Sequence, residues 1–403
     1  MKRARIAVLV VFAVVVTACG GNGTDATTTS AAPTTTTTPQ DTTTTSEALG
    51  EPIKIGVITT TSGALQTYGQ QYLAGLEAGL DYATDGTRVV NNHPIEFVVR
   101  DDALDADAAV THATELVGDG VSIIVGTVGS GVALRLAAFA EENNILYISG
   151  PAATDAVTGV NKNTFRSGRQ SWQDVATAAS LLRNESGTVL VFAQDTAFGQ
   201  GNVAAVTAVL SNFTVESLLV PEAETEFTGY ANQINQANPD LVFVAWAGAT
   251  SGAMWSALNQ QGVFDNTEVA TGLGDSVTWP FYGEDPSGIN FLNHYFPGAP
   301  DNAVNDYLID NVDTPDLFTP DGFVAAQMIV RALSEADADD VDAMITALEG
   351  WTFDAPKGSQ TIRAADHAMI QPMFVVRLNA VTGGFEAELL ATLEGNVTAP
   401  PEQ

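Results

Sequence analysis

Short apolar runs and amphipathic stretches alternate along most of the chain from Glu51 onward. Residues 53–58 are mainly apolar and predict a buried strand, and the stretch after them places Leu73, Leu76 and Leu80 on one stripe of a helix. Strand and helix patterns that alternate in this way predict βαβ units, whose parallel sheet is covered by helices on both faces.

The same alternation occurs in two sets, which predicts two similar lobes. The first set continues with strands at 95–99, 121–125 and 145–149 and helices at 107–117 and 132–143. The second set has helices at 172–183, 200–210, 227–236 and 251–261 and strands at 188–193, 215–220, 241–246 and 268–271. Residues 277–320, rich in Pro, Gly and Asn, are predicted to be crossovers and loops; helices at 323–333 and 341–348 and a strand at 373–378 follow.

The N-terminus is typical of an exported protein. Basic residues precede an apolar run, 6–16, that is too short to span a bilayer but suits a signal peptide. The run ends in V-T-A-C-G, which resembles the bacterial lipobox and implies cleavage after residue 18 and lipid on Cys19. An ordinary secretory signal with a chance cysteine is the alternative. Residues 20–50 are rich in threonine, so we expect 19–50 to be a lipidated cysteine followed by a disordered tether.

Charge and composition exclude several classes of protein. The chain has 48 acidic and 15 basic residues, and a surface this negative repels phosphate backbones, so we expect no nucleic-acid partner. Cys19 is the only cysteine, so neither an intrachain disulfide nor a cysteine-based zinc site can form.

Motifs for catalysis are missing from the sequence. There is no phosphate-binding G-x-x-x-x-G-K-[ST], and the glycines of 126–131 miss the dinucleotide spacing G-x-G-x-x-G. The four histidines are scattered: His93, His112, His294 and His367. We therefore expect a binding protein and not an enzyme, with no cofactor and no metal.

Three polar loops follow predicted strands, at the edge where open α/β sheets bind ligands. Residues 127–131 offer backbone N–H groups at the start of a helix, which favours a carboxylate. Residues 150–154 expose a carbonyl and a hydroxyl, and residues 272–275 present an acid beside glycines. A site with both donors and acceptors suits a zwitterion, although each loop alone is also consistent with ordinary turn chemistry.

Taken together in their order along the chain, these loops and the segments around them resemble those of the type I substrate-binding proteins of ABC importers, in the leucine/isoleucine/valine-binding branch. The resemblance covers most of 51–403 and rests on I-K-I-G-V-I-T-T-T-S-G-A-L-Q-T-Y-G-Q (53–70), V-G-T-V-G-S-G-V-A (125–133), I-S-G-P-A-A-T (148–154), F-R-S-G-R-Q-S-W-Q-D (165–174), A-Q-D-T-A-F-G-Q-G (193–201) and G-L-G-D-S (272–276). It implies an α/β fold of two Rossmann-like lobes with parallel sheets, joined by a three-strand hinge that closes on the ligand. The expected lobes are 51–170 plus 297–370 and 171–296 plus 371–403.

The resemblance also implies a role for particular polar residues. Ser130 matches a serine that contacts the ligand carboxylate, and Ala152 and Thr154 match residues that offer a carbonyl and a hydroxyl or amide. Asp275 lies where the family keeps an acid for the ligand ammonium group. Gln170 stands where amino-acid binders of the family often carry an acid, and this departure leaves the ligand open.

Three aromatic residues complete the predicted site. Phe198 occupies the position of an aromatic that stacks on the ligand, Trp246 lies near a second such position, and Tyr68 matches an aromatic on the rim of the first lobe. Phe198 lacks the usual phenol hydroxyl, which also leaves the ligand open.

The sequence therefore predicts a monomeric, lipid-anchored, extracytoplasmic receptor that captures a small polar solute and delivers it to ABC permease subunits. An amino acid of the branched-chain type is favoured. A ligand-sensing receptor subunit on the same fold is the alternative, and an extracellular hydrolase is a third hypothesis.

Overall fold

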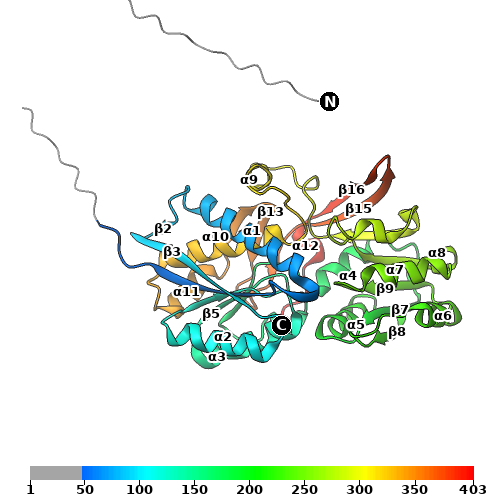
Figure 1. The fold of residues 1–403 in the computed structure, drawn as a ribbon, viewed down its shortest axis with the longest axis horizontal. Helices are drawn as coiled ribbons and strands as arrows, with labels where there is room; N and C mark the ends of the chain where they lie inside the picture. Colours follow the sequence, from blue (N-terminus) through cyan, green and yellow to red (C-terminus); the bar gives the residue numbers. More distant parts are fainter. Residues whose placement is uncertain (1–47) are drawn as a thin grey trace, which may run out of the picture. The chain divides into compact units, whose positions relative to one another are not determined.

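The computed structural model describes residues 48–403, in which two β-sheets each form the centre of a lobe. Figure 1 shows the lobes side by side, the first coloured mainly blue to cyan and the second mainly green to yellow. Cys19 and the predicted signal peptide and most of the tether lie outside the described residues.

The first sheet has the order β2-β3-β1-β4-β5-β6 and is parallel except for β2. Its strands are β1 Ile53–Thr59, β2 Val89–Val90, β3 His93–Asp101, β4 Ile123–Val125, β5 Leu146–Ser149 and β6 Thr164–Arg166. The helices between them are α1 Gln66–Ala83, α2 Ala106–Gly118 and α3 Ser130–Asn143. The central strand β1 is apolar along most of its length because helices bury it on both faces.

The second sheet has the order β16-β15-β11-β10-β9-β7-β8, and its last two strands in sequence are antiparallel. Its strands are β7 Gly187–Gln194, β8 Phe213–Val220, β9 Leu241–Ala245, β10 Glu268–Gly272, β11 Ile289–Asn293, β15 Met373–Val381 and β16 Gly384–Leu393. Its helices are α4 Ser171–Ala179, α5 Ala197–Val209, α6 Thr228–Ala237, α7 Ser251–Gln260 and α8 Val263–Asn266.

After β11 the chain returns to the first lobe and adds further helices and a small sheet to it. These later elements are α9 Ala303–Asn311, α10 Thr319–Glu335, α11 Val341–Leu348 and the small sheet of β12 Thr352–Ala355, β13 Gly358–Ile362 and β14 Met369–Ile370. One hydrophobic core joins Ile55 and Phe165 of the first pass to Val324 and Met369 of the second. The chain therefore crosses between lobes three times, after β6, after β11 and after β14, and the predicted fold class is confirmed.

The tightest helix contact in the first lobe is the crossing of α1 and α10, where glycines let the two backbones touch. A Cβ placed on Gly75 of α1 would lie 1.8 Å from the carbonyl oxygen of Thr319, and one on Gly322 of α10 would lie 1.9 Å from that of Tyr72. Larger residues would hold the helices apart. No helix of 48–403 combines the length and apolarity that a membrane span requires.

The structure corrects several predicted elements. Residues 277–320 were expected to be loops but contain the interior strand β11 and helix α9. The strand was missed because Asn290 and Asn293 interrupt its apolar residues, which lie among Pro, Gly and Asn. The helix expected at 172–183 ends at Ala179, where the amide of Leu181 donates to the carbonyl of Ala178 and the helical pattern tightens into a turn. Strand β16 was not predicted, since it is an edge strand with mostly exposed side chains.

Candidate functional site

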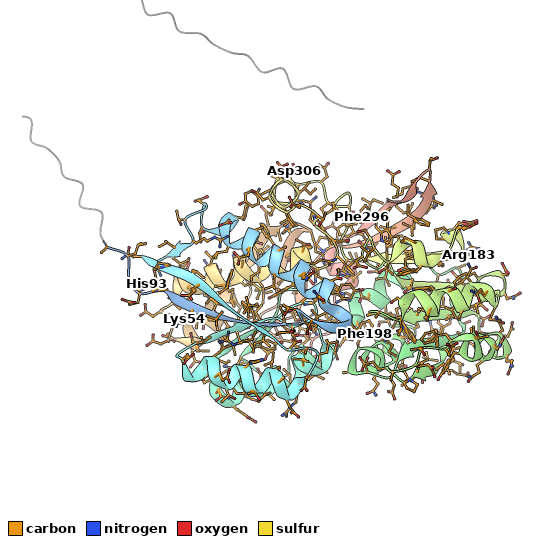
Figure 2. The ribbon with its side chains drawn as sticks, in the orientation of Figure 1. Lys54, His93, Arg183, Phe198, Phe296 and Asp306 are labelled. Carbon is orange, nitrogen blue, oxygen red and sulfur yellow. The ribbon has the colours of Figure 1, made fainter. Side chains whose placement is uncertain are left out.

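A cleft of about 480 Å³ lies between the lobes and is lined by residues of both. In the first lobe, the lining comes from the segments after β1, β3, β4, β5 and β6, and in the second from those after β7, β8, β9, β10 and β11. These are the carboxyl ends of parallel strands, where α/β folds bind ligands. Figure 2 shows Phe198 at the boundary between the two lobes. The volume falls within the usual range for small-molecule sites.

Four of the eight predicted ligand-binding residues line this cleft: Tyr68, Ser130, Phe198 and Trp246. Ser130 is the first residue of α3, and Gly129 before it has no side chain to cap the helix. The first amides of a helix lack partners within the helix, so this end of α3 offers N–H donors to the cleft. Ser130 Oγ also accepts a hydrogen bond from the amide of Thr154 at 3.4 Å.

The aromatic residues in the lining are fixed by contacts of their own. The ring of Tyr68 packs edge to face on Phe318, with 4.7 Å between centroids. Burial, together with nearby Asp275, holds the pKa of the Tyr68 hydroxyl well above its usual value, so this hydroxyl stays protonated. Trp246 donates from Nε1 to the hydroxyl of Thr250 at 3.0 Å. The cleft therefore presents aromatic rings that neighbouring side chains hold in place, beside polar and charged groups.

Three predicted residues lie behind the lining and not in it. The carbonyls of Ala152 and Thr154 both accept hydrogen bonds from Arg166, at 2.8 Å for Ala152. Gln170 caps the start of α4, and its side chain donates to Asp155 at 2.6 Å. These groups are used within the protein, and their roles in ligand binding stay predictions.

Asp275 is also set back from the cleft, next to the lining residue Gly274, and is only 2% exposed. Its carboxylate accepts a hydrogen bond from the hydroxyl of Thr278. Burial raises the pKa of this carboxyl, the hydrogen bond from Thr278 opposes the rise, and the negative charge of Asp316 adds to it. The environment therefore disfavours the ionised form, and a cation placed beside Asp275 would relieve that penalty.

Sequence reasoning missed the charged pair in the lining, Arg169 and Asp174. Arg169 Nε lies 3.2 Å from Asp174 Oδ2, and Arg169 Nη1 donates to the carbonyl of Pro151 at 2.7 Å. The guanidinium lies over the ring of Phe318, 5.5 Å from its centroid. Both charged side chains are almost fully buried. The only signal in the sequence was their place shortly after β6, at the carboxyl edge of the first sheet.

The groups that line the cleft are suited to binding a small solute. The site has hydrogen-bond donors at the start of α3, a guanidinium, a recessed carboxylate and aromatic walls, which together can hold a small solute with polar ends and an apolar body. Residues 48–403 contain no group of three His, Cys, Asp or Glu side chains placed to hold a metal ion.

Comparisons with known proteins agree with this geometry. A family model described as a periplasmic binding protein matches residues 52–384. The Leu/Ile/Val-binding protein homolog 3 of Brucella melitensis is 25% identical, over 73% of this chain and 82% of its own length.

Two solved structures from Rhodopseudomonas palustris share the fold. An ABC-type branched-chain amino acid transporter is 29% identical, with a TM-score of 0.73 over 87% of this chain and 99% of the other. An ABC transporter solute binding protein in complex with 4-hydroxybenzoate is 21% identical, with a TM-score of 0.78 over 85% of this chain and 97% of the other.

Proposed function

Because the chain belongs to the periplasmic binding protein family and is an extracytoplasmic solute-binding protein of ABC transporters, we propose that its cleft captures an amino acid and delivers it to permease subunits. A branched-chain side chain is favoured, since the curated relative and one solved structure carry that specificity in their names. The protein acts as a monomer in this proposal.

The observation that carries the proposal is the cleft between two lobes that are joined by three crossovers. Ser130 belongs to the first lobe and Phe198 and Trp246 to the second, so one solute can contact both. Contacts to both lobes stabilise a closed form over an open one, and a permease can recognise the closed form. The two moving bodies in this proposal are 51–170 plus 297–370 and 171–296 plus 371–403.

The polar groups are arranged to suit a zwitterion. The start of α3 with Ser130 takes the carboxylate, and Asp275 takes the ammonium group, whose charge offsets the cost of ionising a buried carboxyl. Ala152, Thr154 and Gln170 are proposed to contribute to ligand binding from behind the lining, as the sequence predicted. The aromatic lining contacts the side chain of the solute.

The lining also favours a second solute class, aromatic carboxylates. Tyr68, Phe198, Trp246 and Phe318 contribute rings to the cleft, and flat ring systems pack well against such walls. Because 4-hydroxybenzoate is the solute of one structural neighbour, it belongs in the test panel.

The N-terminal part of the proposal is a lipid anchor. Residues 1–18 act as a signal peptide, Cys19 carries the lipid, and 19–50 act as a tether between the membrane and the lobes. Several acyl chains on one cysteine would hold the protein firmly, since a single chain gives only marginal binding.

Two measurements test the solute. Mass spectrometry of small molecules released from freshly purified, denatured protein identifies what the cleft retains. Calorimetric titration with L-leucine, L-isoleucine, L-valine, benzoate and 4-hydroxybenzoate then measures affinity. We expect at least one of the amino acids to bind with micromolar or tighter affinity. If no amino acid binds and none is released from the protein, the amino-acid proposal is contradicted. Binding of an aromatic carboxylate alone would favour the second solute class.

A further inference from the structure

Arg169 is a positively charged side chain in the lining of the cleft. Among the residues that line the cleft, it is the only arginine or lysine. The other charged lining residues are acidic: Asp174, Asp195 and Glu222. A solute that brings negative charge into this cleft therefore has one cationic side chain to meet.

Arg169 differs from its neighbour Arg166, which uses four of its five N–H donors inside the protein. Arg166 donates from Nε to Thr158, from Nη1 to the carbonyls of Ala152 and Arg169, and from Nη2 to the carbonyl of Thr154. Within 48–403, Arg169 donates one hydrogen bond, from Nη1 to Pro151, and its Nε faces Asp174. Its Nη2 has no hydrogen-bond partner among the described residues, so the guanidinium keeps donors for a ligand.

The backbone that anchors the guanidinium follows the strand next to the one that leads into α3. Pro151, which anchors Nη1, follows β5, and β5 pairs with β4, the strand that leads into Ser130. Adjacent strands lie about 4.8 Å apart, so the two donor groups belong to neighbouring positions along one sheet edge. The ring of Phe318 beneath the guanidinium limits its freedom to turn away.

We propose that Arg169 binds the carboxylate of the solute together with the start of α3, and that it makes the cleft selective for free carboxylates over their amides. This inference rests on the proposed function, because it names the charge that the captured solute carries. Asp174 already faces Arg169 Nε, so the solute carboxylate shares the guanidinium with it. Asp174 thus limits how tightly an anion is held.

The experiment uses matched acid and amide probes on the full chain. L-leucine is compared with L-leucinamide and benzoate with benzamide by calorimetric titration. The wild-type protein should prefer the acid of the pair it accepts by about 30-fold or more, since removing one partner of a buried charge pair has a large effect. Arg169→Gln should reduce this preference to about threefold or less, while Arg169→Lys keeps the charge but loses the planar fork and should fall between the two.

Arg183→Gln is the matched control. Arg183 is exposed and lies in the second lobe away from Phe198, as Figure 2 shows, so its loss should leave the acid preference unchanged. A variant that merely perturbs packing would weaken acid and amide alike, whereas the loss of an anion donor weakens the acid only. Thermal unfolding without solute shows whether each variant is folded.

Asp174→Asn tests the same inference from the other side, and serves if Arg169→Gln does not fold. Removing the competing carboxylate should raise the preference for the acid several-fold. The inference alone is overturned if Arg169→Gln keeps the full acid preference, if wild-type protein binds amides as well as acids, or if Asp174→Asn lowers the acid preference. If no acid and no amide binds the wild type, the proposed function fails and this inference fails with it.

Discussion

The crossing of α1 and α10 gives a stability prediction that needs no ligand. Gly75→Ala adds one methyl group at the closest contact of the two helices. The new Cβ would lie 1.8 Å from the carbonyl oxygen of Thr319 and 3.0 Å from the backbone nitrogen of Phe323. Because these are backbone atoms of a helix, they cannot rotate away, and the helices must separate by roughly 1.5 Å to restore normal contact.

The expected loss of stability is the balance of two effects. Overpacking a buried contact costs about 1–3 kcal/mol, and a backbone clash belongs at the upper end. Replacing glycine by alanine within a helix returns about 1 kcal/mol. The free energy of unfolding should therefore fall by about 2 kcal/mol. With an unfolding entropy of about 2.1 cal/mol/K per residue over roughly 350 residues, the Tm should fall by about 3 °C.

Scanning calorimetry and urea unfolding of the solute-free protein measure both quantities. The matched control is Gly229→Ala in α6, where a Cβ would meet nothing within 4 Å, so stability should be unchanged or slightly raised. If Gly75→Ala is as stable as the wild type, or if both variants change alike, then the backbones of α1 and α10 are not in close contact at Gly75.

Three further predictions concern charge, closure and anchoring. Burial raises the pKa of Asp275, so the stability that this carboxyl contributes is present in acid and lost as the pH rises through the raised pKa. In urea unfolding, Asp275→Asn should therefore make the solute-free protein more stable at pH 7, and this gain in stability should fade towards pH 4. The same substitution should weaken the binding of an ammonium-bearing solute by about 2–5 kcal/mol. Saturation with the solute should reduce the radius of gyration in solution scattering, and identical curves would argue for rigid lobes. Cys19→Ser should move the folded protein from the membrane fraction to the soluble fraction, and a variant that stays with membranes would contradict the lipid anchor.

The elements that the sequence predicted well are those in which burial dictates the residues. Parallel strands such as β1 and β9 are covered on both faces, so they are continuous apolar runs that no loop would carry. Strand β11 is buried in the same way but has Asn at two of its five positions, which removes that signal. Strand β16 is the edge strand and most of its side chains are exposed, so burial does not impose a regular apolar pattern on it. Residues 384–393 form a strand because they pair with β15, and this pairing cannot be seen in the local sequence.

For the candidate site too, some residues could be placed from the sequence and others could not. Ser130 and Phe198 could be placed from the sequence because each follows a recognisable strand at the start of a helix, and strand ends meet at one edge of a parallel sheet. Asp275 follows β10 in the same way, yet its side chain is drawn back by the hydroxyl of Thr278. Which way a loop side chain points depends on such local partners, and a sequence pattern does not contain them.

Arg166 and Arg169 differ in their surroundings in a way that their sequence does not reveal. They lie three residues apart in one short motif, and their chemical types are identical. Arg166 ends strand β6, where four of its five N–H donors bond to Thr158, Ala152, Arg169 and Thr154 of the protein itself. Arg169 lies in the crossover beyond the strand, where, within residues 48–403, one carbonyl, that of Pro151, and one carboxylate, that of Asp174, reach its guanidinium. Whether a buried arginine stabilises the fold or recognises a solute is thus decided by how many of its donors the protein itself has used.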